Sequence, residues 1–235
     1  ESEIQDTGLF YFDENKKKNV DRFRDRVIFP INNISGDTIA LGGRILKDNK
    51  YLAKYINSPE TPFFKKGSNL YNLDFSRKLS NNISNIYLVE GYMDVVGLSK
   101  NGIENVVANL GTSLTDKQVQ TLNQFFNDII ICFDGDESGY KAALRAAENS
   151  IRDLKPEKQI SFLFLPNKED PDSFVNKNGK KYFLNFTKQS KLSIHQFIFG
   201  HYKKQTENNP SSMAIFEKKL RSIANTIKDN FIKKY

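Results

Sequence analysis

Five carboxylates stand directly or shortly after short apolar stretches that have the composition of buried strands. In extended backbone, residues i and i+2 point to the same side, so two acids separated by one residue can face a single point. Gathered carboxylates repel one another unless a cation neutralises them, and an all-oxygen set favours Mg²⁺ or Mn²⁺ over zinc. The pattern therefore predicts a divalent-cation site formed by Glu90, Asp134, Asp136, Asp170 and Asp172.

Each acid also has an ordinary structural interpretation. An Asp that follows a strand commonly caps a helix or closes a turn, and Asp94 could be a first-turn acid that the helix dipole favours. Glycines beside the acids, at positions 91, 111 and 135, would let backbone approach a phosphate or a metal closely. Because acids follow three separate strands, capping alone is a poor explanation, and we favour the metal site.

The elements that must position these acids alternate along the middle of the chain. Short apolar segments predict strands at 86–89, 106–108, 129–133 and 160–165, and the segments between them predict helices at 93–100, 115–126 (capped by Thr115) and 138–152. Strands that alternate with helices indicate an α/β fold with a parallel sheet, in which ligands bind beyond the carboxyl ends of the strands.

The two flanks of this α/β region have different patterns. The front predicts strands at 27–31 and 38–45 joined by a turn, then a loop-rich stretch at 47–69 and a short helix at 70–79. After position 173 the chain predicts helices, with a break at 208–210 and an apolar stripe over 215–231. We expect three domains: a basic β-rich part at 1–80, the α/β part at 81–185 and a helical tail at 186–235.

The net charge of +7 is unevenly distributed. Basic residues outnumber acidic ones by five in 20–80 and by seven in 186–235, whereas acidic residues predominate by three in 81–185 and by two in 1–19. Basic flanks around an acidic centre suggest contacts with a polyanion, although solvated lysine-rich faces would give the same totals. The tail could equally bind DNA or pack helices whose outer faces are basic.

Basic and aromatic residues are interleaved in the front. Arg22, Arg24 and Arg26 alternate, so an extended strand would place them on one face opposite Phe23. With Arg44, Lys54, Tyr55 and Lys66, they suit phosphate contacts and base stacking. A solvated edge strand whose charges prevent aggregation is the alternative interpretation.

Composition excludes several classes of protein. The 235 residues are 38% hydrophobic, which is enough for a core, and no apolar run is long enough to cross a membrane. A single cysteine, Cys132, and two histidines make a disulfide framework or a zinc site a poor expectation. No Ser-His-Asp arrangement or phosphate-binding Gly-Lys-Ser/Thr loop is recognisable. The start, Glu-Ser-Glu, suggests a piece of a longer cytoplasmic protein without a secretion signal.

Two motifs resemble the Toprim signature of primases, topoisomerases and some nucleases: Val-Glu-Gly-Tyr-Met-Asp-Val at 89–95, and Phe-Asp-Gly-Asp at 133–136 with a glycine at 139. Further blocks in order resemble the bacterial DnaG-type replicative primases. They are Arg-Phe-Arg-Asp-Arg-Val-Ile-Phe-Pro-Ile at 22–31, Gly-Gly-Arg at 42–44, Lys-Tyr-Ile-Asn-Ser-Pro-Glu-Thr at 54–61, Phe-Lys-Lys-Gly at 64–67, Leu-Gly-Thr at 110–112, and Leu-Pro through Asp-Pro-Asp at 165–172.

This resemblance implies a Toprim-type α/β fold and an RNA polymerase core that makes short primers on single-stranded DNA from ribonucleoside triphosphates. It implies that Glu90, Asp134, Asp136, Asp170 and Asp172 hold Mg²⁺ or Mn²⁺, with no zinc in this fragment, and that Asp94 supports them. Arg44, Lys54, Tyr55 and Lys66 match positions that handle template or nucleotide phosphates. It further implies a monomer at the bacterial replication fork, in the cytoplasm and without membrane contact, which reaches the replicative helicase through a module absent here.

Departures from the family pattern are few, and none removes an expected ligand. Lys65 stands where the family often has His, Ser138 where it has Ala, and Lys168 where a Gly precedes the Asp-Pro-Asp turn. Two alternatives stay open: another Toprim enzyme such as a nuclease, and a non-catalytic domain that binds single-stranded nucleic acid. A nuclease would not need the basic front, and a type IA topoisomerase would need a further large domain.

Overall fold

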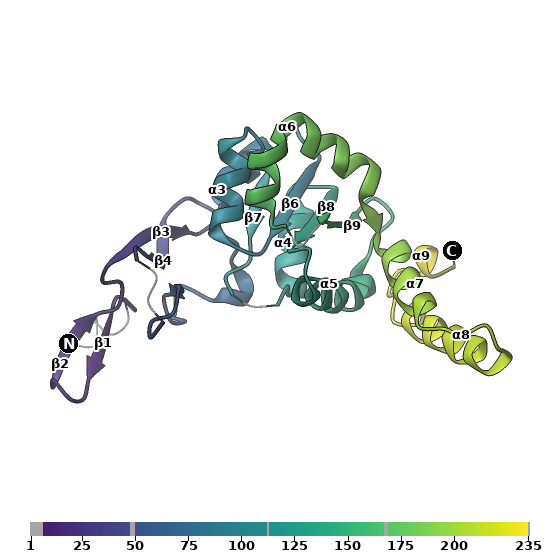
Figure 1. Ribbon diagram of the computed structural model, residues 1–235, viewed down its shortest axis with the longest axis horizontal. Helices are drawn as coiled ribbons and strands as arrows, with labels where there is room; N and C mark the ends of the chain where they lie inside the picture. The colour runs from purple at the N-terminus through teal and green to yellow at the C-terminus, as the bar shows by residue number, and fades with distance from the viewer. Residues whose placement is uncertain (1–6, 48–49, 112, 167–168, 235) are drawn as a thin grey trace.

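The computed structural model describes residues 7–47, 50–111, 113–166 and 169–234. Three parts follow one another along an elongated molecule: small β-sheets at the N-terminal end, a central sheet with helices, and a group of helices at the C-terminal end (Figure 1). Thr112, Lys168 and the first residues of the chain, all of which the sequence analysis uses, lie outside the described residues.

The central sheet has five strands in the order β10-β9-β8-β6-β7. Four of them are parallel, namely β6 (Asn85–Val89), β7 (Val106–Ala108), β8 (Asp128–Phe133) and β9 (Gln159–Phe164), and these confirm the predicted α/β fold with a parallel sheet. The fifth strand, β10 (Leu192–Ser193), is antiparallel to β9 and was not predicted, because two residues carry no recognisable period.

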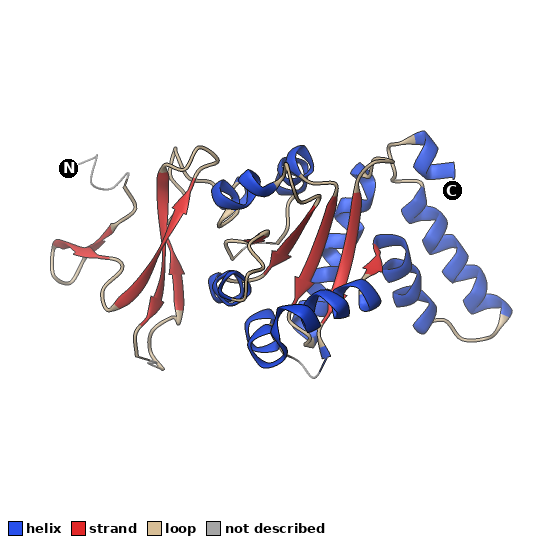
Figure 2. Ribbon diagram, turned by 90° about the horizontal axis from the view of Figure 1, so that it is seen from above, coloured by secondary structure: helices blue, strands red, loops and turns tan. Residues whose placement is uncertain are grey.

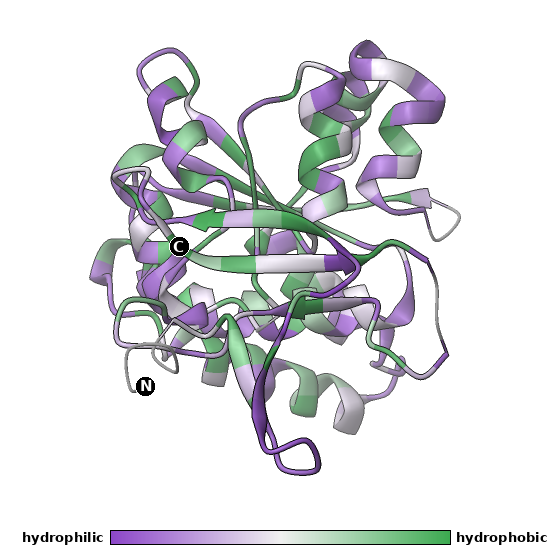
Figure 3. Ribbon diagram, turned by 90° about the vertical axis from the view of Figure 1, so that its left-hand side faces the viewer, coloured by the Kyte–Doolittle hydropathy of each residue, from purple (hydrophilic) through white to green (hydrophobic). Residues whose placement is uncertain are grey.

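Helices cover both faces of this sheet (Figure 2). On one face, α4 (Asp116–Phe125) and α5 (Glu137–Ser150) pack against Ile86 and Leu88. On the other face, α3 (Tyr92–Lys100) and α6 (Pro171–Ser190) lie over Tyr87 and Val89. Successive residues of a strand point to opposite faces, so a strand that is covered on both sides must be apolar throughout. Most helices carry both hydrophobic and hydrophilic residues, as Figure 3 shows.

The N-terminal part contains two small antiparallel sheets. One is a hairpin of β1 (Phe10–Asp13) and β2 (Lys18–Asp21), and the other joins β3 (Arg26–Asn32), β4 (Thr38–Ile45) and β5 (Tyr55–Asn57). The strands at 27–31 and 38–45 are confirmed, whereas β5 lies inside the stretch expected to be loop. The short helix expected at 70–79 is the four-residue α2 (Leu73–Ser76) and a following 3₁₀ turn.

The predicted alternation of Arg22, Arg24 and Arg26 along one strand is wrong. Residues 22–25 form a turn between β2 and β3, and Asp25 has a φ of 54°, which is incompatible with an extended strand. Only Arg26 belongs to a strand, so the three side chains do not share one strand face.

An aromatic cluster joins the three-stranded sheet to the central part. Tyr92, at the start of α3, stacks on Phe29 of β3 with ring centroids 4.8 Å apart, and its edge meets Tyr71 at 4.7 Å. Gly42 of β4 faces the Tyr92 ring so closely that a side chain at this position would collide with it. The shared core around Phe29 and Tyr92 therefore fixes the small sheet beside the first turn of α3.

The C-terminal part contains α7 (Ile194–Lys204), α8 (Pro210–Ala224) and α9 (Asn230–Lys234), which confirms the predicted tail helices. Asn209 caps α8 through its side chain, with Pro210 in the first turn. The expected stripe is only partly buried: Ile227 is in the core, whereas Ile215 and Phe231 are 70% and 76% exposed. No helix in the described ranges is long and apolar enough to span a membrane.

Candidate active site at the edge of the central sheet

Glu90 and Asp134 follow two neighbouring parallel strands, β6 and β8, at the edge where both strands end. The backbone N–H of Asp134 donates a hydrogen bond to Oε1 of Glu90 over 3.3 Å. Gly139, in the first turn of α5, lies against the carbonyl oxygen of Asp134, where a Cβ atom would not fit. Strand pairing therefore brings these two acids together. The close contact at Gly139 lets the loop after β8 lie against α5.

Asp136 and Asp170 cap the helices that follow the acidic loops. Oδ1 of Asp136 accepts the N–H of Gly139 at 2.8 Å, and Oδ1 of Asp170 accepts the N–H of Ser173 at 2.6 Å. This is the structural interpretation that the sequence left open, and it uses one carboxylate oxygen of each residue. The N–H of Gly135 also donates to the carbonyl oxygen of Glu169 over 3.2 Å, so the two loops are joined.

Asp172 and Asp94 lie near the contact between α3 and α6. The expectation that Asp170 and Asp172 face one point in extended backbone is wrong, because Pro171 begins α6 and Asp172 is already helical. Asp172 packs against Gly97 of α3 and accepts a hydrogen bond from Asn176 at 2.6 Å. Asp94 is buried and accepts the N–H of Gly91 at 3.0 Å, which fixes the turn directly after Glu90.

Burial and the charges of neighbouring carboxylates raise the pKa values of several acids at this edge. Burial, and then the charges of Glu90, Asp170 and Asp136, raise the pKa of Asp134 to about 6. Burial, and then the charges of Asp134 and Asp170, raise the pKa of Asp94 to about 7. Loss of surrounding water and the charge of Asp136 also raise the pKa of Glu90. The edge therefore holds more negative charge than its surroundings neutralise.

An all-oxygen set with excess negative charge has the donor chemistry that Mg²⁺ and Mn²⁺ require. The residues fit such an ion in chemistry and in charge. Within the described ranges, however, no three His, Cys, Asp or Glu side chains are gathered closely enough to enclose a metal as they stand. Two of the acids would have to combine capping with coordination.

Arg44 and Tyr55 lie opposite each other on β4 and β5, near the acidic edge. The guanidinium carbon of Arg44 is 6.0 Å from the Tyr55 ring centre, and the buried Nε of Arg44 has no hydrogen-bond partner among the described residues. Burial raises the pKa of Tyr55; the charge of Arg44 opposes this rise, and the charges of Asp94 and Asp172 add to it. The fold therefore places this basic and aromatic pair within electrostatic reach of Asp94 and Asp172.

The other expected nucleic-acid contacts are distributed over the small sheets. The side chain of Arg22 donates to the carbonyl oxygen of Gly8, and that of Arg26 donates to the carbonyl oxygens of Gly43 and Lys54, so both arginines brace backbone. Arg24 is exposed and lies 3.4 Å from the hydroxyl of Tyr11. Lys54 is exposed before β5, and Lys66 is half-buried in a 3₁₀ turn.

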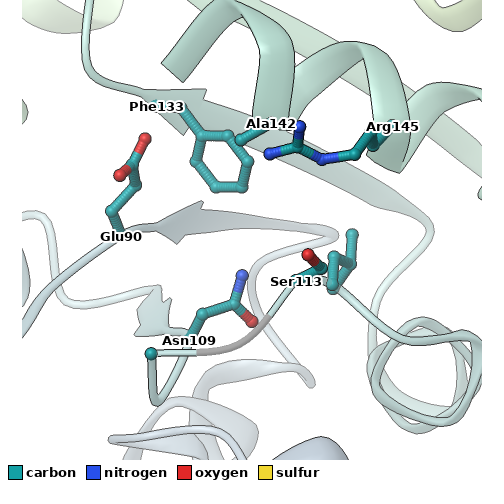
Figure 4. Close-up of a pocket in the computed structure, with 8 residues that line it drawn as sticks. Glu90, Asn109, Ser113, Phe133, Ala142 and Arg145 are labelled. Atoms are coloured by element: carbon teal, nitrogen blue, oxygen red, sulfur yellow. The ribbon is translucent and has the colours of Figure 1, made fainter. Parts of the chain in front are cut away.

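Residues that the sequence analysis did not single out complete the site. Tyr92 donates to Oδ1 of Asn57 at 2.6 Å, and Nδ2 of Asn57 donates to the carbonyl oxygen of Leu110 at 3.0 Å. Asn109 and Arg145 line a cavity beside Glu90 (Figure 4). Asn109 follows β7 directly, so the rule that located the acids would have located it had amides been considered.

Two family models match the chain: the N-terminal domain of the DNA primase catalytic core at residues 1–77, and the Toprim domain at residues 84–164. A DNA primase of Pseudomonas aeruginosa is 44% identical over 194 residues, which are 83% of this chain and 29% of that protein. A DNA primase of Neisseria meningitidis is 43% identical over 198 residues, which are 84% of this chain and 33% of that protein. The chain thus spans about a third of these curated relatives.

Solved structures match the whole chain. A DNA primase domain from Pseudomonas aeruginosa has a TM-score of 0.93 at 38% identity, and the match covers 99% of this chain and 72% of the Pseudomonas chain. The E. coli primase catalytic core has a TM-score of 0.93 at 35% identity, and the match covers 100% of this chain and 74% of the E. coli chain. A DnaG primase catalytic domain bound to single-stranded DNA has a TM-score of 0.92 at 35% identity, and the match covers 100% of this chain and 72% of that domain's chain. With the Toprim motifs on its central sheet, the chain belongs to the bacterial DnaG-type DNA primases.

Proposed function

We propose that this chain is the catalytic part of a primase, a DNA-directed RNA polymerase that makes short RNA primers on single-stranded DNA from ribonucleoside triphosphates. The observation that carries the proposal is the linked pair Glu90 and Asp134 on neighbouring strands, in an acidic edge where burial, and then the charges of the other carboxylates, raise the pKa values of both. In the reaction, the 3′-hydroxyl oxygen of the primer bonds to the α-phosphorus of the incoming nucleotide. The bond from that phosphorus to the β-phosphate oxygen breaks, pyrophosphate leaves, and the hydroxyl proton is released to solvent.

Glu90, Asp134 and Asp136 would hold the divalent ions, together with Asp170, and Asp172 would contribute from the first turn of α6. When bound, Mg²⁺ or Mn²⁺ lowers the pKa of the 3′-hydroxyl and stabilises the leaving pyrophosphate. Asp94 acts through the Gly91 amide that it accepts, which orients the turn carrying Glu90. Asp136 and Asp170 keep their loops in place by capping α5 and α6.

The basic residues would neutralise the nucleic acid. Arg44 and Tyr55 lie near the acids and suit the incoming triphosphate, with Lys54 and Lys66 on the neighbouring segments. A primase catalytic domain solved with single-stranded DNA bound is similar to this chain, which supports binding of a single-stranded template. We place the template over the basic front, where Arg22, Arg24 and Arg26 lie, because their charges suit its phosphates. We propose that the protein acts as a monomer at the bacterial replication fork, in the cytoplasm, and meets the helicase through a segment outside this chain.

The test is nucleotide incorporation on a single-stranded template with Mg²⁺ or Mn²⁺, comparing the wild type with Asp134→Asn/Asp136→Asn. Asparagine caps a helix about as well as aspartate, so the double variant removes charge and keeps the cap. Asp116→Asn, an exposed first-turn acid on α4, is the matched control. We expect incorporation by the wild type and the control only.

Equal incorporation by the double variant would show that these acids do not carry the reaction. Single-strand binding that is indifferent to Mg²⁺ and to both substitutions, without incorporation by the wild type, would favour the non-catalytic alternative. Metal-dependent cleavage of the template would favour a nuclease.

A further inference from the structure

A cavity of about 240 Å³ lies over the ends of β7, β6 and β8 and is closed on one side by α5. Figure 4 shows the Arg145 guanidinium reaching into it from α5, with Asn109 and Ser113 on the opposite wall and Glu90 at one end. Arg145 supplies a cation to the lining, and Asn109, Ser113 and Glu90 supply polar or acidic groups. The apolar part of the lining is formed by Leu114, Phe133 and Ala142. Such a mixture suits a ligand that has both charged and apolar portions.

Among the described residues, two polar groups of this cavity have no partner: the guanidinium of the exposed Arg145 and the side-chain oxygen of Asn109. Within the described part of the chain, no carboxylate lies in ion-pairing distance of Arg145, although lysines and arginines elsewhere form such pairs. Asn109 is 8% exposed, and its Oδ1 is buried with no hydrogen-bond partner among the described residues. Because this oxygen is fully enclosed, the amide nitrogen of Asn109 is the end of the side chain that faces the cavity and that a ligand can reach (Figure 4).

The cavity is separate from the residues proposed to bind the triphosphate. Arg44 and Tyr55 have Asp94 and Asp172 as their acidic neighbours, and neither lines the cavity. The cavity meets the acidic edge at Glu90 instead. Nucleotidyl transfer needs two nucleotides at the same carboxylates, one that carries the triphosphate and one that offers a 3′-hydroxyl.

We propose that this cavity binds the acceptor, the 3′-terminal ribonucleotide of the growing RNA strand. Arg145 pairs with the phosphate of that nucleotide, and Asn109 and Ser113 form hydrogen bonds with its ribose hydroxyls. Leu114, Phe133 and Ala142 form the apolar wall for the rest of the nucleoside, and Glu90 lies next to the 3′-hydroxyl. This assignment rests on the proposed function.

The size and chemistry of the cavity favour one ribonucleotide over a longer stretch of strand. The cavity of about 240 Å³ is smaller than the roughly 300–1,000 Å³ of sites that enclose a drug-sized ligand, so it has no room for more than one nucleoside unit. The side-chain amide of Asn109 can donate a hydrogen bond to the oxygen of a 2′-hydroxyl, which deoxyribose lacks. We therefore expect the cavity to prefer a ribonucleotide to its deoxy counterpart.

The probe is the diribonucleotide ApA, titrated into the 235-residue chain and followed by nuclear magnetic resonance of labelled Arg and Asn side chains. We expect saturable shifts of the Arg145 and Asn109 signals, and weaker binding of the deoxy dinucleotide. Loss of one charge-assisted hydrogen bond in Arg145→Gln weakens ApA binding about tenfold. Arg152→Gln, which removes the same charge from an exposed position just after α5, leaves binding unchanged.

Asn109→Leu gives a second signature, because it removes the unpartnered acceptor and keeps the side-chain size. It should leave the free energy of unfolding unchanged or raise it, weaken ApA binding, and abolish the preference over the deoxy dinucleotide. A merely structural asparagine would show loss of stability instead.

The proposal is overturned if the wild type does not bind ApA at any accessible concentration. It is also overturned if ApA shifts signals elsewhere and leaves Arg145 and Asn109 unmoved, or if Arg145→Gln binds it as tightly as the wild type. Failure of the proposed function is a different result, because it appears as absent incorporation by the wild type and needs no dinucleotide.

Discussion

The central sheet and the N-terminal small sheets are both β-structure, yet they place functional side chains by different means. In the central part, buried parallel strands end at one edge, and the position of Glu90 or Asp134 follows from the strand before it. In the small sheets, a turn carries Arg22 and Arg24 while Arg26 and Arg44 lie in strands, and apolar residues such as Val27 stay 45% exposed. Rigid strand ends therefore fix the acids that the chemistry needs, whereas the basic surface is built from separate local contacts.

The largest expected effect tests the acidic edge itself. Glu90→Gln removes one charge and keeps the shape, so we expect nucleotide incorporation to fall about a thousandfold, as for loss of a group that stabilises charge in a transition state. Binding of single-stranded DNA, measured by fluorescence anisotropy, should stay within about twofold, because the basic front is untouched. Retained incorporation would remove Glu90 from the site.

The next comparison sets the core of one region against the surface of the other. Phe162→Ala empties a fully buried position in β9, and such a change costs about 3–5 kcal/mol. Val27→Ala on β3 should change the free energy of unfolding by less than about 0.5 kcal/mol, because its side chain is already half in solvent. Urea denaturation measures both, and similar losses would show that the side chain of Val27 is packed in a buried setting.

The pH dependence of stability tests the crowding of charge at the edge. The pKa of Asp94 is raised from 3.8 to about 7, so its contribution to stability is present below pH 4 and is lost as the pH rises through 7. At about 1.4 kcal/mol per pKa unit, the loss is on the order of 4 kcal/mol. Without divalent ions, the wild type should therefore lose stability relative to Asp94→Asn between pH 4 and pH 8.

Thermal unfolding across that pH range, with both proteins in the same buffers, makes this measurement. A constant difference between the two proteins would mean that Asp94 is not held in a negatively charged, buried setting. Added Mg²⁺ should reduce the slope, because a cation at the edge favours the charged carboxylates.

A smaller effect separates capping from chemistry at Asp136. Its Oδ1 accepts the Gly139 amide, so Asp136→Ala should lower the free energy of unfolding by about 1 kcal/mol, whereas Asp136→Asn should leave it nearly unchanged. Both variants should lose incorporation, because both lack the charge. Full activity in the asparagine variant would assign Asp136 to the cap alone.

The smallest effect concerns the basic front. Arg24 is exposed, so Arg24→Gln should weaken binding of single-stranded DNA only a few-fold and lower the salt dependence of the binding constant by about one unit. Arg22 and Arg26 brace backbone carbonyls, and their glutamine variants should also lower the free energy of unfolding. Equal behaviour of all three variants would contradict the roles assigned to these contacts.

Sequence reasoning succeeded where one physical rule dominated. The four parallel strands were predictable because burial on both faces makes them almost wholly apolar, and the edge of the acids followed from the strand ends. It failed where the backbone conformation of one or two residues changed the direction of the chain. Asp25 adopts a positive φ that turns the chain between Arg24 and Arg26, and Pro171 starts a helix that carries Asp172 toward α3. Arg145 was missed because tertiary packing of α5 on the sheet brings it to the cavity, whereas Asn109 was missed because only acids were considered at the strand ends.

The central claim is that carboxylates at the ends of β6 and β8 bind a divalent cation, and Mn²⁺ titration followed by electron paramagnetic resonance tests it most directly. The wild type and Asp116→Asn should bind Mn²⁺ saturably, whereas Glu90→Gln and Asp134→Asn should lose this binding while remaining folded. Saturable binding of equal affinity in all four proteins would contradict the claim.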